Sequence, residues 1–236
     1  MSSFSAPSND RPRIVALLPM KLNSVRVTGK NFREFCGKPL FRWILDSLLE
    51  INEISQVIIN TDARDLLRDN GLVNGPKVLI RDRRPEICGD LVSMNSVIAD
   101  DIANVKADIY VMTHTTNPLL SPATISEAIS QFIKSSSSSN IDSLFSVNKL
   151  QTRFYTAMCT PINHDPSNLI PTQDLEPWFE ENSNLYIFTS QSFMASKARI
   201  GIKPMLFESP RLESIDIDTL EDWKLAEVIA NSHLVK

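Results

Sequence analysis

The sequence predicts an α/β fold, a mostly parallel open sheet flanked by helices. Short apolar runs of strand length alternate with longer amphipathic segments from residue 13 to residue 134. Such alternation is typical of parallel strands joined by crossover helices. The first run, 13–19, is apolar without a polar face, as expected for a strand buried on both faces of a sheet.

The elements follow in chain order. The run 13–19 is ended by Pro19, and Pro39 then opens an amphipathic helix at 40–49, because proline is favoured in the first turn of a helix. The serine run 135–139 is expected to be a solvated surface loop. The other expected strands are 56–60, 77–81, 108–113, 143–147, 184–189 and 204–207, and the other expected helices are 63–69, 94–104, 121–134 and 219–235.

One domain accounts for most of the chain. A length of 236 residues is sufficient to bury a core. Residues 1–12 are polar, lack the apolar core of a signal peptide, and are expected to form a disordered leader, which leaves 13–236 for the domain. The segment at about 149–181 is irregular and rich in Pro, Asn and Asp. A long irregular insert in a compact domain is usually functional or an interface.

Composition excludes several classes of protein. A formal net charge of −4 argues against nucleic-acid binding, which needs a basic stripe. No apolar run approaches the roughly 20 residues that a membrane span needs. Three cysteines without a CxxC pair are typical of a reduced, cytoplasmic protein. The chain has neither GxGxxG after the first strand nor GxxxxGK[ST], which disfavours dinucleotide-binding and P-loop folds.

The loop after the first expected strand gathers positive charge. Lys21, Arg26 and Lys30 lie within ten residues, together with Ser24 and Asn31. Ligands of open α/β sheets bind beyond the carboxyl ends of the strands, where this loop lies. A nucleoside triphosphate needs its phosphate charge neutralised, above all on the departing pyrophosphate. We therefore interpret the loop as a phosphate-binding element; a solvated basic loop is the alternative.

The stretch Ser214-Ile-Asp-Ile-Asp218 is expected to be a strand that carries Asp216 and Asp218 on one face. Two adjacent carboxylates are costly unless a cation lies between them. Hard oxygen ligands at this spacing suit Mg²⁺, which bridges carboxylates and substrate phosphates. Alternatively, Asp218 caps the helix that begins near residue 219, a role that leaves Asp216 unexplained; both roles could coexist.

Further polar residues follow the predicted strands. Asn60-Thr61-Asp62 could contact a nucleotide, although helix capping is the favoured role for Asp62. Arg84 could face a base. Ser93 could face an acceptor, or it could cap the helix at 94–104. His114 lies directly after the strand 108–113, at the ligand edge of the sheet.

In their order along the chain, these motifs resemble those of the CMP-acylneuraminate synthetases. These cytidylyltransferases activate sialic acid and related nonulosonic acids; the CMP-Kdo synthetases are more distant relatives. The resemblance covers roughly residues 13–230 and includes Thr115-Thr116-Asn117-Pro118. It implies a nucleotide-diphospho-sugar transferase-like α/β domain and a homodimer, with the dimerisation element placed at about 149–181.

The resemblance also implies a reaction, in which the anomeric hydroxyl of a 2-keto acid sugar attacks the α-phosphorus of CTP. The products would be a CMP-sugar and pyrophosphate, and Mg²⁺ would be the cofactor. Transferred by position, the implied nucleotide-binding residues are Lys21, Ser24, Lys30, Asn31 and Arg84, with Arg84 facing cytosine. Arg26 is added to them because it could compensate for Val25, which occupies the position of a family lysine. Ser93 and His114 would line the acceptor pocket, and Asp216 and Asp218 would hold Mg²⁺. Catalytic roles are implied for Lys21, Lys30 and Asp218, the last as an aid to deprotonation of the hydroxyl.

The chain departs from the family pattern in both halves of the site. Lys21 stands in place of the usual arginine, Val25 in place of a lysine, and His114 in place of a glutamine. Residues 180–183 read Glu-Glu-Asn-Ser where the family has Arg-Pro-Asn-Gly. The acceptor therefore stays open between a nonulosonic acid, Kdo and a phosphonate. Two other interpretations are a D-x-D glycosyltransferase, which Asp216-Ile-Asp218 would also suit, and a nucleotide-binding module without catalysis.

Overall fold

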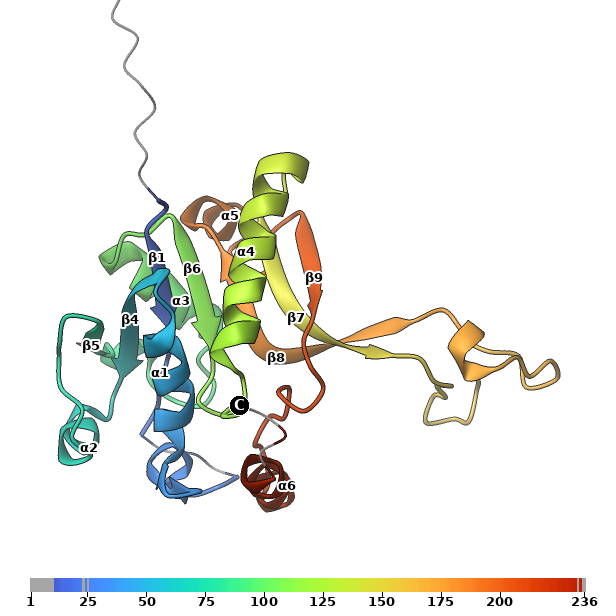
Figure 1. Ribbon diagram of the computed structural model, residues 1–236, viewed down its shortest axis with the longest axis horizontal. Coiled ribbons are helices and arrows are strands. Elements are labelled where there is room, and N and C mark those ends of the chain that lie inside the picture. The colour runs from blue at the N-terminus through green and yellow to red at the C-terminus, as the bar shows by residue number, and fades with distance from the viewer. Residues whose placement is uncertain (1–10, 23, 25, 233, 235–236) are drawn as a thin grey trace, which may run out of the picture.

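The computed structural model describes residues 11–22, 24, 26–232 and 234. The first ten residues of the expected leader and the substitution at Val25 lie outside these residues. The described chain forms a seven-stranded sheet of order β5-β4-β1-β6-β8-β7-β9 and a small β2-β3 hairpin (Figure 1). The strands are β1 (Ile14–Leu17), β2 (Glu34–Phe35), β3 (Lys38–Pro39), β4 (Ile54–Thr61), β5 (Val78–Asp82), β6 (Ile109–Thr113), β7 (Ser143–Leu150), β8 (Trp178–Phe188) and β9 (Pro204–Glu208).

The predicted mostly parallel sheet is confirmed. Strands β5, β4, β1 and β6 run parallel, as do β7 and β9, while β8 pairs antiparallel with both β6 and β7. The helices are α1 (Leu40–Glu50), α2 (Arg64–Asp69), α3 (Met94–Asn104), α4 (Pro122–Ser139), α5 (Ser190–Ser196) and α6 (Leu220–Asn231). No helix in the described part of the chain has the length and apolar character needed to cross a bilayer.

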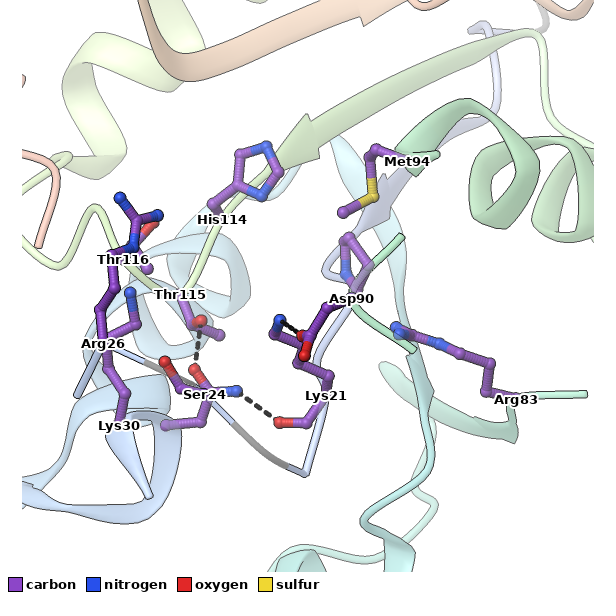
Figure 2. Close-up of a pocket in the computed structure, with 12 residues that line it drawn as sticks. Lys21, Ser24, Arg26, Lys30, Arg83, Asp90, Met94, His114, Thr115 and Thr116 are labelled. Carbon is purple, nitrogen blue, oxygen red and sulfur yellow. Dashed lines mark hydrogen bonds and ion pairs between the residues drawn. The ribbon is translucent and has the colours of Figure 1, made fainter. Parts of the chain in front are cut away.

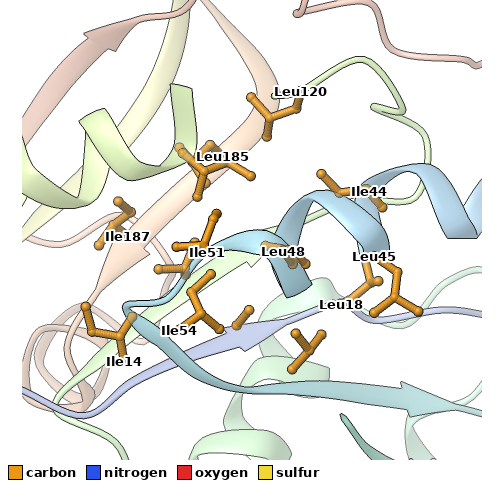
Figure 3. Packing of buried hydrophobic residues seen from close by; sticks show 14 of the residues in the cluster. Ile14, Leu18, Ile44, Leu45, Leu48, Ile51, Ile54, Leu120, Leu185 and Ile187 are labelled. Atoms are coloured by element: carbon orange, nitrogen blue, oxygen red, sulfur yellow. The ribbon is translucent and has the colours of Figure 1, made fainter. Parts of the chain in front are cut away.

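Both faces of the sheet are covered, which explains the unbroken apolar run of β1. Alternate residues of this run enter two separate cores: Leu18 packs with α1 and α4, whereas Leu17 packs with α3 and α5. Figure 3 shows Ile44 and Leu48 of α1 and Ile54 of β4 within the cluster of buried residues on the first of these faces. A strand between two helix layers has no solvated side and needs no polar residues there.

A third cluster of buried residues holds together the segments that lie beyond the carboxyl ends of the parallel strands. Phe35 of the β2-β3 hairpin meets Trp223 of α6 edge-on, with ring centroids 5.4 Å apart. Val27 of the first loop and Ile217, which precedes α6, are buried in the same cluster. Segments from the two ends of the chain are thereby held side by side.

Two expectations about secondary structure are wrong. The serine run is not a loop, because α4 continues through Ser139. Its hydroxyls bond back within the helix: Ser137 and Ser138 donate to the carbonyls of Ile133 and Lys134 at 3.0 and 2.9 Å. The stretch 214–218 is not a strand, and its backbone bonds instead to the turn after β6.

Strands β7 and β8 extend beyond the sheet as a two-stranded arm that carries residues 151–177 at its tip (Figure 1). The register shifts where the arm leaves the sheet: Phe145 faces Tyr186, but Val147 faces Glu181. Ser183, inside this bulge, has a positive φ of 56°. The expected insert at about 149–181 therefore includes strand at both of its ends, and its irregular part is shorter than predicted.

Candidate functional site

A cavity of about 330 Å³ opens beyond the carboxyl ends of β1, β5 and β6 (Figure 2). The first loop forms one side, and the turn after β6 and the start of α3 form the other. The lining residues are Pro19, Lys21, Ser24, Arg26, Lys30, Asn31, Arg83, Asp90, Met94, His114, Thr115 and Thr116. The position at the ligand edge of the sheet is the one predicted from the topology.

Asn31 fixes the first loop against the turn after β6. It is buried, its amide nitrogen donates to the Lys21 carbonyl at 2.8 Å, and its amide oxygen accepts from the Thr115 hydroxyl at 2.7 Å. Since both ends of the amide are engaged, Asn31 holds the loop in shape as well as lining the cavity.

Two of the predicted cations pair with one of the predicted carboxylates, that of Asp218. Arg26 forms a 2.8 Å ion pair with Asp218, and Nζ of Lys30 lies 3.5 Å from the same carboxylate oxygen. Lys30 is buried, and burial lowers its pKa, an effect that the charges of Asp218 and Asp216 oppose. Lys21 pairs instead with Asp90 at 2.6 Å. The first loop and the residues before α6 therefore share one site.

The stretch 214–218 is held in place although it is not a strand. The Ile217 amide donates to the Thr116 carbonyl at 2.8 Å, and the Asn117 side chain donates to the Ile215 carbonyl at 3.4 Å. One carboxylate oxygen of Asp216 is buried and has no hydrogen-bond partner among the described residues. Burial raises the pKa of Asp216, and the neighbouring charge of Asp218 adds to this effect.

Asp218 does not cap α6. The cap residue is Thr219, which accepts from the Asp222 amide, while the Asp222 side chain accepts from the Thr219 amide at 2.7 Å. The capping alternative for Asp218 is therefore wrong, because the helix begins one residue later than that role requires. The Asp218 carboxylate is free to face Arg26 and Lys30.

The residues present suit a divalent cation at Asp216 and Asp218. A buried carboxylate oxygen without a partner is costly unless something binds it. Within the described residues no group of three or more His, Cys, Asp or Glu side chains is arranged around a common point. A cation held by two carboxylates would take its other ligands from substrate oxygens and water, as Mg²⁺ commonly does.

Arg83 lines the cavity, and the predicted base contact Arg84 does not. Arg84 pairs with Asp100 at 3.0 Å, and its side chain is 62% exposed. The Arg83 guanidinium donates to the Asn60 backbone carbonyl at 2.7 Å and to the Asn60 side-chain oxygen at 3.0 Å. The sequence could not distinguish these neighbours, because the chain after β5 is irregular and no periodicity assigns a direction to either side chain.

Ser93 and Asp62 have structural contacts. Ser93 is exposed and caps α3 by accepting from the Asn95 amide at 3.2 Å, which is the alternative considered for it; the adjacent Met94 lines the cavity. Asp62 does not cap α2, which begins after Ala63 without a side-chain cap. Instead Asp62 accepts from the Leu22 amide at 2.6 Å and so fixes the start of the first loop.

His114 lines the cavity, as predicted, and has a partner that the sequence did not reveal. Its Nε2 lies 3.2 Å from Nη1 of Arg199, a residue 85 positions away that follows α5. Burial lowers the pKa of His114 to about 3, with further contributions from the positive charges of Arg199 and Lys30. The imidazole is therefore neutral at physiological pH.

Comparisons with known proteins cover nearly the whole chain. A protein-family model described as "Cytidylyltransferase" matches residues 15–232. The chain is 27% identical to the CMP-N,N'-diacetyllegionaminic acid synthase of Legionella pneumophila, over 91% of this chain and 95% of that protein. It is 23% identical to a pseudaminic acid cytidylyltransferase of Campylobacter jejuni, again over 91% and 95%.

A solved structure with a similar fold is that of a CMP:2-keto-3-deoxy-manno-octonic acid synthetase complexed with CTP. It matches with a TM-score of 0.65 at 14% identity, over 94% of this chain and all of that one (100%). The 4-diphosphocytidyl-2C-methyl-D-erythritol synthase of Anaerococcus prevotii matches with a TM-score of 0.66 at 11% identity, over 93% of this chain and 96% of that one. At these identities the likeness concerns the fold.

Proposed function

Because the chain belongs to the cytidylyltransferase family, we propose that it couples CTP to an acidic sugar of the nonulosonic acid class. The products are a CMP-sugar and pyrophosphate. The observation that carries the proposal is that Arg26 and Lys30, which line the cavity, both pair with Asp218. The names of the relatives from Legionella pneumophila and Campylobacter jejuni, which match along nearly their whole length, support the class of acceptor.

The phosphates of CTP are assigned to the first loop. Lys21, Arg26 and Lys30 line the cavity from this side, and Ser24 lies among them. Lys30 is the most constrained cation, because it is buried and its ammonium is anchored to the Ile217 carbonyl at 2.6 Å. A cation that is held in place before the ligand arrives stabilises developing phosphate charge without reorganisation. Lys21 and Lys30 therefore stabilise the departing pyrophosphate.

The cytosine base of CTP is assigned to the wall of the cavity beyond the end of β5. Arg83 lines that wall, and Asn60 holds its guanidinium through two hydrogen bonds. We assign to Arg83 the cytosine contact expected of Arg84, whose guanidinium is directed to Asp100.

Asp216 and Asp218 are the residues that would hold Mg²⁺. When bound, the ion would neutralise the phosphate oxygens and polarise the α-phosphorus for attack. The unpartnered buried oxygen of Asp216 supports this assignment. Asp218 also lies at the phosphate-binding loop, next to Arg26 and Lys30, and we assign to it the deprotonation of the attacking hydroxyl.

The acceptor is assigned to the His114 side of the cavity. His114 is neutral there, with Nε2 turned to Arg199. A neutral imidazole can exchange hydrogen bonds with sugar hydroxyls but carries no charge for a carboxylate. Met94 takes the place expected of Ser93 in the lining.

We also propose that the protein is a homodimer that assembles through the arm. Trp178 and Phe179 on the arm are 39% and 45% exposed, and Leu169 at its tip is 66% exposed. Clusters of exposed apolar side chains are typical of protein–protein interfaces.

We also propose a cytoplasmic location. All three cysteines are free, which supports a reducing compartment.

A pyrophosphate-release assay tests the proposed reaction. The protein is incubated with CTP and Mg²⁺ and with N-acetylneuraminic, legionaminic and pseudaminic acids, Kdo and a phosphonate in turn. We expect pyrophosphate and a CMP-sugar in equal amounts with at least one nonulosonic acid. Turnover only with Kdo or the phosphonate would reassign the acceptor. CTP binding without turnover would indicate a non-catalytic module, and nucleotide release from a nucleotide-sugar would indicate a glycosyltransferase.

A further inference from the structure

Arg199 lies against the acceptor side of the cavity and is tightly located there. Its Nη1 is 3.2 Å from His114 Nε2, and its guanidinium carbon lies 3.7 Å from the centre of the Tyr186 ring. Its backbone amide donates to the Asn95 side-chain oxygen at 3.3 Å, next to the lining residue Met94. Helix α3 thus holds the Arg199 backbone, while His114, directly after β6, and Tyr186 of β8 hold the guanidinium.

This side of the cavity needs a cation if the acceptor is an acid. Figure 2 shows His114 and Met94 along one side and Lys21, Ser24 and Lys30 along the other. The cations of the second group belong to the phosphate-binding loop and already have acidic partners, Asp90 for Lys21 and Asp218 for Lys30. His114 is neutral. Within the described part of the chain, Arg199 is the charged neighbour that contacts His114.

We propose that Arg199 binds the carboxylate of the acidic sugar, and that Glu181 is its counter-ion when no acceptor is bound. The inference rests on the proposed function, because the ligand is the acceptor of that reaction. A guanidinium presents two parallel N–H groups that match a carboxylate, so Arg199 suits this ligand better than a lysine would.

The acceptor carboxylate can replace Glu181 as the partner of Arg199. Nη2 of Arg199 donates to Glu181 at 3.3 Å, and the Glu181 side chain is 41% exposed. A partly exposed ion pair of this length contributes little free energy, so an incoming carboxylate can replace it at small cost. The Tyr186 hydroxyl also donates to Glu181. Burial raises the pKa of Tyr186 to about 12, so this hydroxyl stays protonated and can hold Glu181 after Arg199 is released.

The bulge of β8 is what brings the pair together. Between the pairs Val147–Glu181 and Phe145–Tyr186, β8 has four residues, 182–185, where β7 has only Ser146, and the Tyr186 hydroxyl donates back to Glu181. Glu181 therefore lies beside Arg199, whereas Glu180, at the position where the resembled family has an arginine, accepts from the Asn148 side chain at 3.0 Å. In this chain the positive charge comes from a different segment, the loop after α5.

The test measures the Michaelis constants for CTP and for the acid separately. Three variants are compared with wild type, using whichever of N-acetylneuraminic, legionaminic or pseudaminic acid gives most pyrophosphate: Arg199→Met, Arg199→Lys and Glu181→Gln. Arg68→Met is the control, since Arg68 is 63% exposed and pairs with Asp65 on its own helix α2. Thermal unfolding of each variant monitors the fold.

Arg199→Met should raise the Michaelis constant for the acid by about tenfold or more and leave that for CTP within about twofold. Arg199→Lys should give an intermediate value, and Glu181→Gln should lower the constant for the acid or leave it unchanged. The role of Arg199 would be overturned if the Michaelis constant for the acid were unchanged in Arg199→Met. It would also be overturned if that constant rose equally in Arg199→Met and Glu181→Gln. Neither result would affect the proposed function. No pyrophosphate from wild type with any of the three acids would overturn the proposed function and this inference with it.

Discussion

The Lys30 ammonium donates a 2.6 Å hydrogen bond to the backbone carbonyl of Ile217, a residue 187 positions away. Ile217 lies between the two proposed metal ligands, Asp216 and Asp218. The same ammonium is 3.5 Å from the Asp218 carboxylate. One buried side chain therefore joins the phosphate-binding loop to the acidic segment, and both halves of the proposed CTP site depend on it.

Replacing Lys30 should weaken CTP binding. Lys30→Ala removes a buried phosphate partner and the tie to Ile217, so the Michaelis constant for CTP should rise by about tenfold. Lys38→Ala is the matched control: Lys38 also pairs with a carboxylate, that of Asp46, but it does not line the cavity. Steady-state kinetics at varied CTP concentration measure this constant. A Michaelis constant for CTP that is unchanged in Lys30→Ala would place this residue outside the site.

Replacing Asp218 should affect turnover and leave the fold intact. Asp218→Asn should lower kcat by ~100-fold or more, because positioning of a metal ion against phosphates is a large catalytic contribution. The neighbouring Thr219→Ala serves as its control. It removes the cap of α6 and should cost about 1 kcal/mol in the free energy of unfolding, with a much smaller effect on kcat. Near-normal turnover in Asp218→Asn would contradict the metal assignment.

Replacing His114 by glutamine should preserve catalysis. The neutral imidazole accepts from Arg199 through Nε2, and a glutamine carbonyl can accept in the same way. We expect kcat within about threefold of wild type, because no change of charge is involved. A fall of a hundredfold or more in His114→Gln would show that the imidazole itself takes part in proton transfer.

His114 also predicts a pH dependence of stability. The pKa of His114 is lowered in the folded state from 6.5 to about 3, so the unfolded state binds the proton first as the pH falls. The stabilising effect of a neutral His114 is thus complete above about pH 6.5 and is lost as the pH falls toward 3. Denaturant unfolding should show a steeper loss of stability between pH 7 and pH 4 in wild type than in His114→Gln. Parallel pH curves for the two proteins would refute the shift.

The arm predicts the oligomeric state. Changing Trp178 and Phe179 together to lysine should convert a dimer to a monomer in sedimentation experiments, because both side chains are exposed on β8. Val73→Lys, at a residue 61% exposed on the connection between α2 and β5, should leave the dimer unchanged. A wild-type protein that sediments as a monomer would remove the basis for this assignment.

The sequence predicted those features that depend on local patterns. The bounds of α3, Met94–Asn104, follow from its apolar spacing and from Ser93 as its cap. The resemblance to the CMP-acylneuraminate synthetases is confirmed as to family by the match over residues 15–232 and by the relatives that share it. The first loop lies at the predicted edge, because the order of the parallel strands fixes where their carboxyl ends meet.

What the sequence did not predict depends on contacts between distant segments or on side-chain direction. Arg199 reaches His114 only because β8 and α5 return beside β6. Arg83 rather than Arg84 lines the cavity because Asn60 holds it there. The acidic pair is presented by an irregular stretch bonded to Thr116, so the strand geometry invoked for it was wrong although the two carboxylates belong to the same site.

The central claim is that the carboxylates of Asp216 and Asp218 share a divalent ion with the phosphates of CTP. Calorimetric titration of CTP with and without Mg²⁺, on wild type and on the Asp216→Asn, Asp218→Asn double variant, tests it most directly. We predict that Mg²⁺ tightens CTP binding about tenfold or more in wild type and has little effect in the double variant. Equal tightening by Mg²⁺ in both proteins would contradict the claim.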